Sequence, residues 1–395
     1  MVPERTQSDA LVVHYHELGL KGRNRNFFEH ALLTNVRRAL RGTGYRRVRA
    51  GFGRIVVDFD PGARLSQAAE RAARVFGVAY VGAGVRTAAA MDMISDAALD
   101  VVRQDPFESF RVRARRTYST LEASSRTVNT VVGQNIKDST GARVDLSHAD
   151  ATAWIELFGS TAIVYRTRLQ GPGGLPSGVS GRMLALVSGG IDSPVAAWRM
   201  MRRGADVEVV HFHGQPFSDT SSASQAAELV RILTNYQLRT LLHLVPLADA
   251  QREIVTHAPS SLRVVLYRRA MLRIAAALAS ERDARAIVTG DSLGQVASQT
   301  TENLKTMDAA LPGVQVFRPL IGMDKAEIIA CARDIGTYDT STRKYQDCCV
   351  LFEPRAPATR ATPAIAEEAE RSVDVEGLVG KALAGAESRA FELPG

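Results

Sequence analysis

The stretch ALVSGGIDSPVAAW, residues 185–198, decides the fold of the second half of the chain. Its first apolar residues predict the end of a buried strand, and the residues after Asp192 have the spacing of a helix. The turn between them, SGGIDS (188–193), contains glycines that allow a close approach of the backbone, so that successive N–H groups converge on an anion at the helix N-terminus. Ser188 and Ser193 add hydroxyl donors. The turn therefore predicts a phosphate-binding site. The alternative is a structural strand-to-helix turn in which a serine caps the helix.

This turn differs from two other phosphate-binding loops. A Walker A loop needs GxxxxGK[ST], with a lysine that reaches the outer phosphates, and a dinucleotide fingerprint needs GxGxxG. The turn matches neither pattern and contains no lysine. Asp192 would repel phosphates unless Mg²⁺ lay between its carboxylate and the ligand. The combination indicates a nucleotide that is cleaved between its α and β phosphates, with pyrophosphate held by the turn.

The composition predicts a folded protein of two or three domains. The chain has 395 residues, of which 45% are hydrophobic and 23% charged, and a domain usually has about 100–200 residues. No apolar run reaches the roughly 18 residues of a membrane span, and the N-terminus has no signal-peptide pattern, so we expect a cytoplasmic protein without a membrane segment. The three cysteines, Cys331, Cys348 and Cys349, exclude a disulfide framework, and no Cys/His cluster has metal-ligand spacing.

Positive charge is concentrated near the N-terminus, although the net charge is only +7. Residues 21–54 contain ten basic residues and a single acid, Glu29, and FRVRARRTY (110–118) begins by alternating apolar and basic positions, as a strand with one charged face does. Such blocks within foldable sequence favour RNA or DNA as a partner, and a solvated basic surface is the alternative. The residues expected to contact RNA are Lys21, Arg23, Arg25, Arg37, Arg38, Arg46, Arg47, Arg111 and Arg113.

The chain divides at LQGPGGLPSGVSG (169–181), where glycines and prolines interrupt every periodic pattern. Upstream, small α+β units are expected, with strands at 11–16, 54–59, 110–114 and 162–166 and helices at 27–42 and 127–138. Downstream, regular alternation predicts a doubly wound parallel sheet with helices on both faces. Its expected strands are 183–187, 207–213, 240–247 and 286–290, and its helices 193–203, 221–235, 263–281 and 324–334. Such a sheet binds its ligand beyond the carboxyl ends of its strands.

Further motifs carry a resemblance to a known family. SGGIDS resembles the PP-loop of ATP pyrophosphatases, which adenylylate a substrate. Over about residues 10–360 the chain is similar to the tRNA 4-thiouridine synthase (tRNA sulfurtransferase) family. The matching stretches are YHELGLKGRNRNFFE (15–29), VHFHGQPF (210–217), YRRAMLRIA (267–275), TGDSLGQVASQT (289–300) and RPLIGMDKAEII (318–329).

The resemblance implies a domain order and an activity. The implied domains are a ferredoxin-like domain (1–72), a THUMP RNA-binding domain (73–168) and, after the linker (169–181), a PP-loop domain (182–360). The Ala/Glu-rich composition of the remaining residues predicts an acidic C-terminal tail (361–395) that is a peripheral helix or loose. The implied reaction is the replacement of uracil O4 by sulfur at position 8 of tRNA, with ATP and Mg²⁺ as cofactors and a cysteine desulfurase as partner. Some members also supply sulfur for thiamine thiazole synthesis through a sulfur-carrier protein, and a homodimer is compatible with the sequence.

The family's ATP contacts carry over onto strand ends and the turn, where backbone groups and apolar faces suit an adenine ring. Taken alone, His211 and His213 could form a metal pair, and Arg268 could be a charge on a helix surface. Asp192 is also the predicted catalytic and Mg²⁺-binding acid. The predicted cofactor-binding residues are Leu186, Val187, Ser188, Gly189, Gly190, Asp192, Ser193, His211, Phe212, Arg268, Gly290 and Gln299.

The second expected chemical centre is KYQDCCVLFEPR (344–355). The thiolate is the reactive form of cysteine, and nearby cations favour it. The resemblance implies that Cys348 is catalytic and receives persulfide sulfur, whereas Cys349 falls where other members tolerate glycine. Two buried cysteines are the alternative, and Cys331 is expected to face the core from a helix. Longer members carry a rhodanese domain that has no counterpart here, so sulfur is expected to pass directly from the desulfurase to Cys348.

Two other functions fit parts of the pattern. A PP-loop enzyme that thiolates a different nucleotide would share SGGIDS, but TGDSLGQ and the THUMP-like N-terminal half favour 4-thiouridine synthesis. A pure RNA-binding or sulfur-carrier-dedicated protein that has lost its tRNA activity would not need an intact PP-loop, and the turn at 188–193 is complete.

Overall fold

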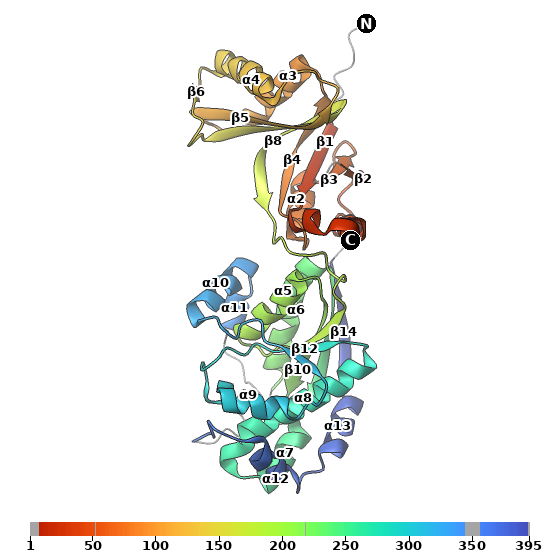
Figure 1. Cartoon of the computed structure of the whole chain (residues 1–395), viewed down its shortest axis with the longest axis vertical. Coiled ribbons are helices and arrows are strands. Elements are labelled where there is room, and N and C mark those ends of the chain that lie inside the picture. The colour runs from red at the N-terminus through yellow and green to blue at the C-terminus, as the bar shows by residue number, and fades with distance from the viewer. Residues whose placement is uncertain (1–7, 52, 218, 344–355, 394–395) are drawn as a thin grey trace. The chain divides into compact units, whose positions relative to one another are not determined.

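A computed structural model of the chain describes residues 8–51, 53–217, 219–343 and 356–393. The chain forms two compact units that meet in sequence between Pro176 and Ser177, within the predicted linker (Figure 1). Among the described helices, none combines the length and the apolar character needed to cross a membrane.

The N-terminal unit is built on one eight-stranded sheet. Its strands are β1 (Ser8–His14), β2 (Tyr45–Gly51), β3 (Arg54–Phe59), β4 (Tyr80–Ala88), β5 (Ser109–Ser119), β6 (Arg143–Val144), β7 (Ala151–Gly159) and β8 (Thr161–Gln170). Its helices are α1 (Arg25–Ala39), α2 (Leu65–Arg74), α3 (Met91–Val102) and α4 (Ser125–Thr140). The strand order is β2-β3-β1-β4-β8-β7-β5-β6. Neighbouring strands are antiparallel, except that β5 is parallel to β6 and β7.

Strands β4 and β8 approach each other closely at Gly84. A Cβ at this position would lie 2.0 Å from the carbonyl oxygen of Val164, so only glycine fits. On the far half of the sheet, α3 and α4 bury apolar residues such as Ile94 and Val128 against Ile155. The upstream α+β pattern therefore folds as one continuous sheet with a helical layer packed against it.

The C-terminal unit contains a six-stranded sheet. Its strands are β9 (Arg182–Leu186), β10 (Asp206–His213), β11 (Arg239–Pro246), β12 (Ala286–Val288), β13 (Gln315–Phe317) and β14 (Glu387–Glu392). Its helices are α5 (Asp192–Arg202), α6 (Ser221–Gln237), α7 (Ala248–His257), α8 (Arg263–Glu281), α9 (Thr301–Asp308), α10 (Lys325–Ile335), α11 (Tyr338–Ser341), α12 (Pro363–Glu370) and α13 (Val375–Ala384). The order is β13-β12-β9-β10-β11-β14, and only β14 runs antiparallel to its neighbour.

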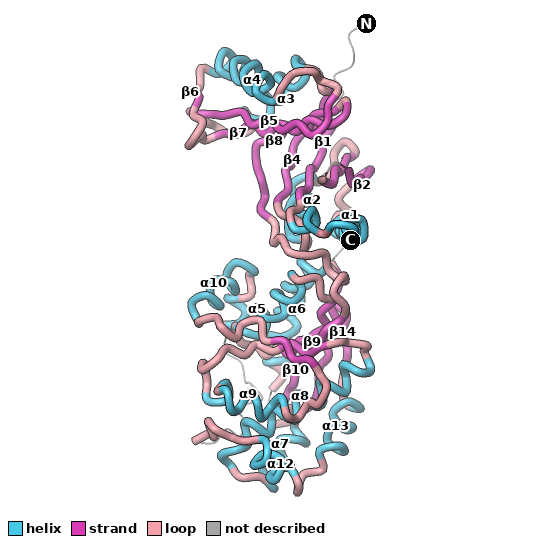
Figure 2. The backbone as a smooth tube through the Cα atoms, in the orientation of Figure 1, coloured by secondary structure: helices cyan, strands magenta, loops and turns pink. Residues whose placement is uncertain are grey.

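The strand order of this sheet reverses at β9. From β9 the chain runs through β10 to β11 on one side and then crosses to β12 and β13 on the other. Figure 2 shows β9, β10 and β14 of this sheet among the helices of the unit. Parallel connections are right-handed, so this reversal places α5 and α6 on one face and α7 and α8 on the other. The predicted doubly wound sheet with helices on both faces is confirmed, and its ligand crevice is expected between β9 and β12.

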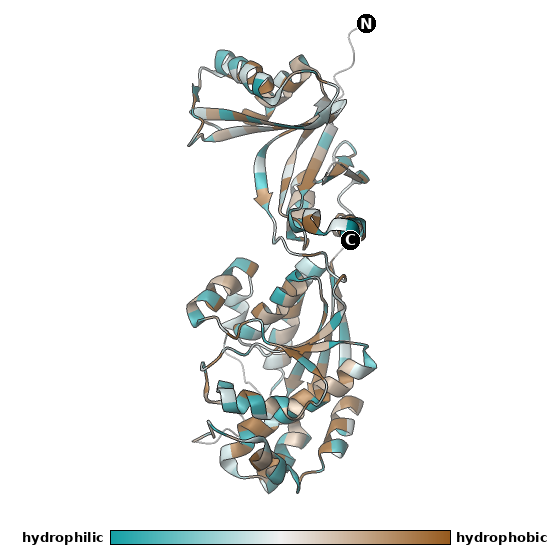
Figure 3. Cartoon of the chain, viewed as in Figure 1, coloured by the Kyte–Doolittle hydropathy of each residue, from teal (hydrophilic) through white to brown (hydrophobic). Residues whose placement is uncertain are grey.

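The segment predicted as an acidic tail, 361–395, folds as part of the C-terminal unit up to residue 393. Helices α12 and α13 pack on α8 through a shared apolar cluster, and Figure 3 shows hydrophobic residues on α13. Glu370 pairs with Arg269 at 2.8 Å and with Arg273 at 2.7 Å, and β14 adds to the sheet beside β11. Composition predicts a peripheral or loose segment. It cannot show that Glu370 pairs with Arg269 and Arg273 of α8.

Candidate active site

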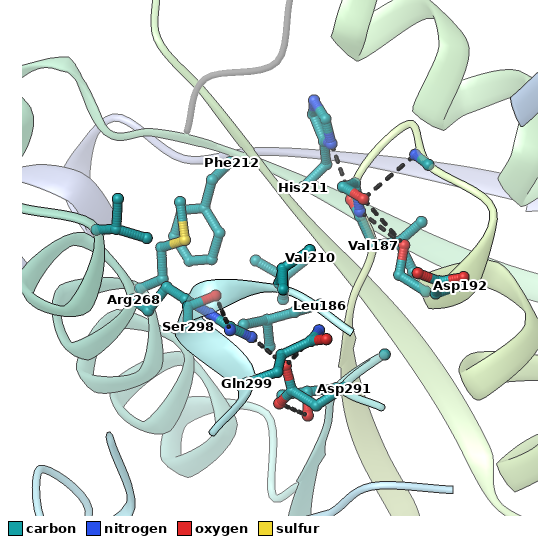
Figure 4. A pocket seen from close by; sticks show the side chains of 18 of the residues that line it. Leu186, Val187, Asp192, Val210, His211, Phe212, Arg268, Asp291, Ser298 and Gln299 are labelled. Atoms are coloured by element: carbon teal, nitrogen blue, oxygen red, sulfur yellow. Dashed lines mark hydrogen bonds and ion pairs between the residues drawn. The ribbon is translucent and has the colours of Figure 1, made fainter. Parts of the chain in front are cut away.

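A cavity of about 420 Å³ opens at the carboxyl ends of β9, β10 and β12, where the strand order reverses (Figure 4). Helix α8 and the loop of residues 290–299 contribute to its wall. Among the predicted residues, Gly189 does not line the cavity. Those that do are Leu186, Val187, Ser188, Gly190, Asp192, Ser193, His211, Phe212, Arg268, Gly290 and Gln299. The structure thus brings these residues together, and their contact with ATP stays a prediction.

Two serines give the turn at 188–193 its shape. Ser188 N–H donates to Ser193 Oγ at 3.0 Å, and Gly190 N–H donates to Ser188 Oγ at 3.2 Å. Helix α5 begins at Asp192, and the first N–H groups of a helix have no partner within that helix. The turn therefore leads into a helix N-terminus whose dipole and N–H groups suit an anion.

The carbonyl groups of the turn are engaged by residues from other elements. Gln225 Nε2 of α6 donates to the Gly189 oxygen at 2.8 Å, and Ser341 Oγ of α11 donates to the Gly190 oxygen at 3.2 Å. Both donors are buried. Because carbonyl oxygens repel phosphate, these two bonds favour a turn that meets an anion with its N–H groups.

Asp192 acquires a lysine partner that sequence reasoning missed. Lys325 Nζ lies 2.6 Å from Asp192 Oδ1, although the two residues are 133 positions apart, and Gln295 Nε2 donates to Oδ2 at 2.7 Å. Lys325 is the first residue of α10, whose N-cap Asp324 forms a capping box with Glu327. The turn has no lysine of its own, and the fold supplies Lys325 from the stretch 318–329. That stretch carries the family resemblance but contains no residue that was predicted as part of the site.

A buried carboxylate, Asp291, orients a second cation at the cavity. Asp291 is 1% exposed and accepts hydrogen bonds from Arg268, from Thr289 at 2.7 Å and from Arg318 at 3.3 Å. Burial alone would raise the pKa of Asp291, but the charge of Arg268 and the bond from Thr289 outweigh it and lower the pKa. Arg268 also donates to Ser298 at 3.0 Å. The alternative that Arg268 is a charge on a helix surface is therefore wrong.

Part of the cavity wall is apolar and carries one unpartnered acceptor. Val210, Phe212 and Met271 line it. Gln299 donates through Nε2 to Asp291 at 3.3 Å, and its buried Oε1 has no hydrogen-bond partner among the described residues. A buried acceptor without a partner is costly, so this oxygen is suited to the amino group of a planar ligand such as adenine.

His211 is held within the wall by two hydrogen bonds. Its Nδ1 donates to the Val187 oxygen at 2.8 Å, which leaves Nε2 to accept from Ser222 Oγ at 3.2 Å. No group of three or more His, Cys, Asp or Glu side chains in the described part of the chain could hold a metal ion. The metal-pair alternative for His211 and His213 therefore finds no further ligand there.

The cysteines are described only in part. Cys348 and Cys349 lie outside the described residues, so their roles stay predictions. Cys331 on α10 is half-buried rather than fully within the core, and Nη2 of Arg199 on α5 lies 3.6 Å from its Sγ.

The predicted RNA contacts of the N-terminal unit include one arginine-lined groove. It has a volume of about 540 Å³, and Arg37, Arg46 and Arg47 line it together with Arg49 and Tyr45. Arg46 and Arg47 are exposed on β2. Arginines that flank an aromatic ring are typical of surfaces that bind nucleic acid.

The other predicted RNA residues differ in their surroundings. Lys21 and Arg25 pair with glutamates of their own segment, Arg23 is exposed, and Arg38 is partly exposed on α1. Arg54 of the same basic block is fully buried and pairs with Glu156, so the sequence overcounts the surface charge of this region.

Arg111 and Arg113 on β5 hold a loop. Arg111 Nη1 donates to the carbonyls of Leu146 and Ser147 at 3.2 Å, and Arg113 Nη2 donates to Leu146 at 3.4 Å. Trp154 lies beside Arg113 on the neighbouring strand β7. The two arginines therefore have a structural role, which does not remove their charge from this face of the sheet.

Three family models match the chain in order. They are the ThiI ferredoxin-like domain over residues 10–82, the THUMP domain over 88–166, and "Thiamine biosynthesis protein (ThiI)" over 178–375. These matches confirm the predicted succession of ferredoxin-like, THUMP and catalytic regions, while the boundaries predicted for the domains stay predictions.

Full-length relatives agree with the family models. A probable tRNA sulfurtransferase of Thermus thermophilus is 43% identical over 385 residues, which cover 98% of this chain and 94% of the relative. One of Moorella thermoacetica is 41% identical over 375 residues, which cover 95% of each chain. A crystal structure of a 4-thiouridine synthetase–RNA complex with bound ATP has a TM-score of 0.88 and 33% identity, covering 98% of this chain and all of that one. The chain belongs to the ThiI family of tRNA sulfurtransferases.

Proposed function

We propose that this chain uses ATP to replace the O4 of uridine 8 in tRNA by sulfur, which gives 4-thiouridine. The observation that carries the proposal is the cavity at the strand-order reversal, which is lined by the turn at 188–193, by Asp192 and by Gln299 with its unpartnered oxygen, while Lys325 pairs with Asp192. The relatives named as tRNA sulfurtransferases and the similar structure that holds RNA and ATP support the choice of substrates.

In this proposal ATP lies along the cavity. The adenine ring packs against Val210, Phe212 and Met271, and its amino group donates to Gln299. The outer phosphates meet the N–H groups of the turn at 188–193. The uracil O4 then attacks the α-phosphorus, pyrophosphate leaves within the turn, and the oxygen on C4 has become part of a good leaving group.

Mg²⁺ fits beside Asp192. This ion is commonly held by one or two carboxylates together with substrate phosphates. Each Asp192 oxygen accepts one hydrogen bond, from Lys325 or from Gln295, and keeps further acceptor capacity. When bound, Mg²⁺ neutralises phosphate charge, and Lys325 adds a positive charge on the same side.

Sulfur is proposed to arrive as a persulfide on Cys348, delivered directly by a cysteine desulfurase. The terminal persulfide sulfur attacks C4, AMP leaves with the former O4, and a disulfide then joins the base to Cys348. A thiol of the added reductant attacks the Cys348 sulfur of this disulfide and forms a mixed disulfide with it, and a second reductant thiol then releases Cys348 as a thiol and leaves oxidised reductant. The thiouridine leaves as a thiolate and takes a proton from solvent.

The test is a reconstituted reaction. The chain, ATP, Mg²⁺, cysteine desulfurase, cysteine and unmodified tRNA are expected to give AMP and the near-ultraviolet absorbance band of 4-thiouridine. Asp192→Ala should abolish AMP release. Under added reductant, Cys348→Ser should eliminate thiolation, whereas Cys349→Ser and Cys331→Ser should retain most of it. A different thionucleoside in the digest would show that the chain modifies another position, and an active Cys348→Ser beside an inactive Cys349→Ser would exchange the two roles.

A second acceptor is favoured by the description of the matching family model as a thiamine biosynthesis protein. We propose that the same persulfide also supplies a sulfur-carrier protein. Replacing tRNA by such a carrier in the same reaction should give a carrier thiocarboxylate, which mass spectrometry detects.

A further inference from the structure

An exposed apolar patch borders the nucleotide cavity. It consists of Leu293, Val296 and Ile321, which are 54%, 51% and 39% exposed. In the described part of the C-terminal unit, only two other large hydrophobic side chains, Phe217 and Ile365, are exposed to this degree. Val296 also lines the cavity itself. Exposed apolar side chains that gather at one place mark a binding site, whereas single scattered ones do not.

Two residues of the patch belong to the loop of residues 290–299, which follows the cavity from one end to the other. At the first end, Gly290 approaches the backbone of Ser193 so closely that a Cβ would lie 2.8 Å from its Cα. In the middle, Gln295 Nε2 donates to Asp192 Oδ2 at 2.7 Å. At the far end, the last residue of the loop before Thr300 lines the wall proposed for adenine. The middle of the loop therefore lies beside the expected place of the α-phosphate.

The backbone of the patch is fixed, although its side chains are exposed. Leu293 N–H donates to the Ile321 oxygen at 3.1 Å, and Ser292 Oγ donates to the Met323 oxygen at 2.8 Å. These two bonds join the two segments that carry the patch. Gly294, the next residue, has a φ of 74°, and a Cβ there would meet nothing within 4 Å. A ligand can therefore approach the backbone directly beside Leu293.

The size and position of the patch fit a single base. The reaction requires O4 of the target uracil within reach of the α-phosphorus, and enzymes that act on a base usually take it out of the helical stack and hold it against aromatic or apolar side chains. A stable interface with another protein uses about 20–30 residues on each side, far more than three. The patch offers one apolar surface, beside the atom that the uracil must reach.

We propose that Leu293, Val296 and Ile321 hold the uracil of tRNA that is modified, after it has left the stack, with its O4 directed toward the α-phosphate. The inference rests on the proposed function and adds a subsite for the reacting base. Affinity for the whole tRNA comes mainly from contacts to phosphates. The patch therefore governs how often bound tRNA reacts, and contributes little to how tightly it binds.

A photocrosslink tests the subsite without turnover. tRNA that carries 4-thiouridine at position 8, the proposed product, is bound to the chain with AMP and Mg²⁺ and irradiated in the near ultraviolet, which links the thiouracil to side chains in contact with it. After digestion with trypsin and nuclease, mass spectrometry should find the nucleotide on the peptides 286–305 and 306–325, which contain the patch. The same tRNA with its 4-thiouridine in the anticodon loop is the control and should not label these peptides.

Variants test the subsite in the reconstituted reaction. Leu293→Ala should lower kcat/KM for tRNA by roughly 5–20-fold, the lower part of the range for the loss of one stacking contact to a base. The KM for ATP should change less than about twofold, because the bond that joins the loop to Asp192 is intact. tRNA affinity in filter binding should stay unchanged. Leu293→Met keeps an apolar surface and should retain most of the activity. Ile365→Ala on α12, at a side chain that is 51% exposed, is the matched control and should behave as the parent.

Four results would overturn the inference. They are crosslinks confined to other peptides, parent-like kcat/KM for tRNA in both Leu293→Ala and Ile321→Ala, and equal losses for ATP and tRNA with a lower melting temperature, which would show that Leu293 only supports the loop. The fourth is a loss with cysteine desulfurase but not with sodium sulfide, whose HS⁻ attacks C4 directly as AMP leaves. That result would assign the patch to the sulfur-donating protein. Failure of the proposed function would appear separately, as a parent chain that forms no 4-thiouridine.

Discussion

Replacing Gly290 by alanine tests how closely the chain that follows β12 must approach the turn at 188–193. A Cβ on residue 290 would lie 2.8 Å from both Cα and N of Ser193 and 3.1 Å from the carbonyl carbon of Asp192. These are backbone atoms at the start of α5, and carbon atoms prefer a separation of about 3.5 Å or more. The turn must therefore shift by about 0.7 Å. Overpacking of this kind costs about 1–3 kcal/mol.

The expected result for Gly290→Ala is a loss of both stability and catalysis. Each kcal/mol lowers the melting temperature by about 2–4 °C for a unit of this size, and the displaced turn should lower kcat/KM for ATP by roughly 10–100-fold. Gly322→Ala is the control, because a Cβ there meets nothing within 4 Å. ATP titrations of AMP release and thermal unfolding of both variants provide the measurements. Parent-like kcat/KM and melting temperature in Gly290→Ala would refute the view that the close approach shapes the turn.

Three further predictions concern charged residues. Lys325→Met should lower turnover by roughly 100-fold or more, because it removes a cation from the developing phosphate charge, while tRNA affinity measured by filter binding stays unchanged. Arg46→Gln should weaken tRNA binding and lower the slope of log K against log salt by about 0.7–0.9; an unchanged slope would make the groove a solvated surface. Burial alone would raise the pKa of Glu208, but the hydrogen bonds from His243 and Arg282 outweigh burial, and the net effect is a pKa lowered to about 2. Its stabilisation is therefore complete above about pH 4.5 and disappears as the pH falls through 2, so Glu208→Gln should lose up to about 3 kcal/mol at neutral pH and show a flatter acid-unfolding profile.

The elements around the cavity could be predicted because their signals are local. The apolar run before 188–193, the glycines of the turn and the helical spacing after it indicate a strand, a phosphate-binding turn and a helix, and the structure has β9 and α5 at these places. The regular alternation downstream then predicts a parallel sheet, and parallel strands have their carboxyl ends at one edge, where such sheets bind ligands. Leu186, His211 and Gly290 lie together because β9, β10 and β12 run parallel.

The partners of charged side chains could not be predicted, because they depend on contacts between distant segments. Arg54 reads as one more surface cation of a basic block, yet it is buried against Glu156, 102 residues further along the chain. Glu370 reads as part of a peripheral acidic stretch, yet it pairs with Arg269, 101 residues earlier. Sequence shows how many charges a segment has, and only the assembled sheet shows which of them neutralise one another.

Lys325 occupies a position that its local environment does not favour. It is the first residue of α10, where the positive end of the helix dipole disfavours a cation by about 0.3–1 kcal/mol. The capping box of Asp324 and Glu327 places two carboxylates around the same helix end, and the pair with Asp192 adds a third. A residue placed against local preference and compensated by its neighbours is typical of a functional site. The sequence MDKAEII already contains this conflict, since a lysine directly follows an N-cap aspartate, and it is the signal from which this residue could have been found.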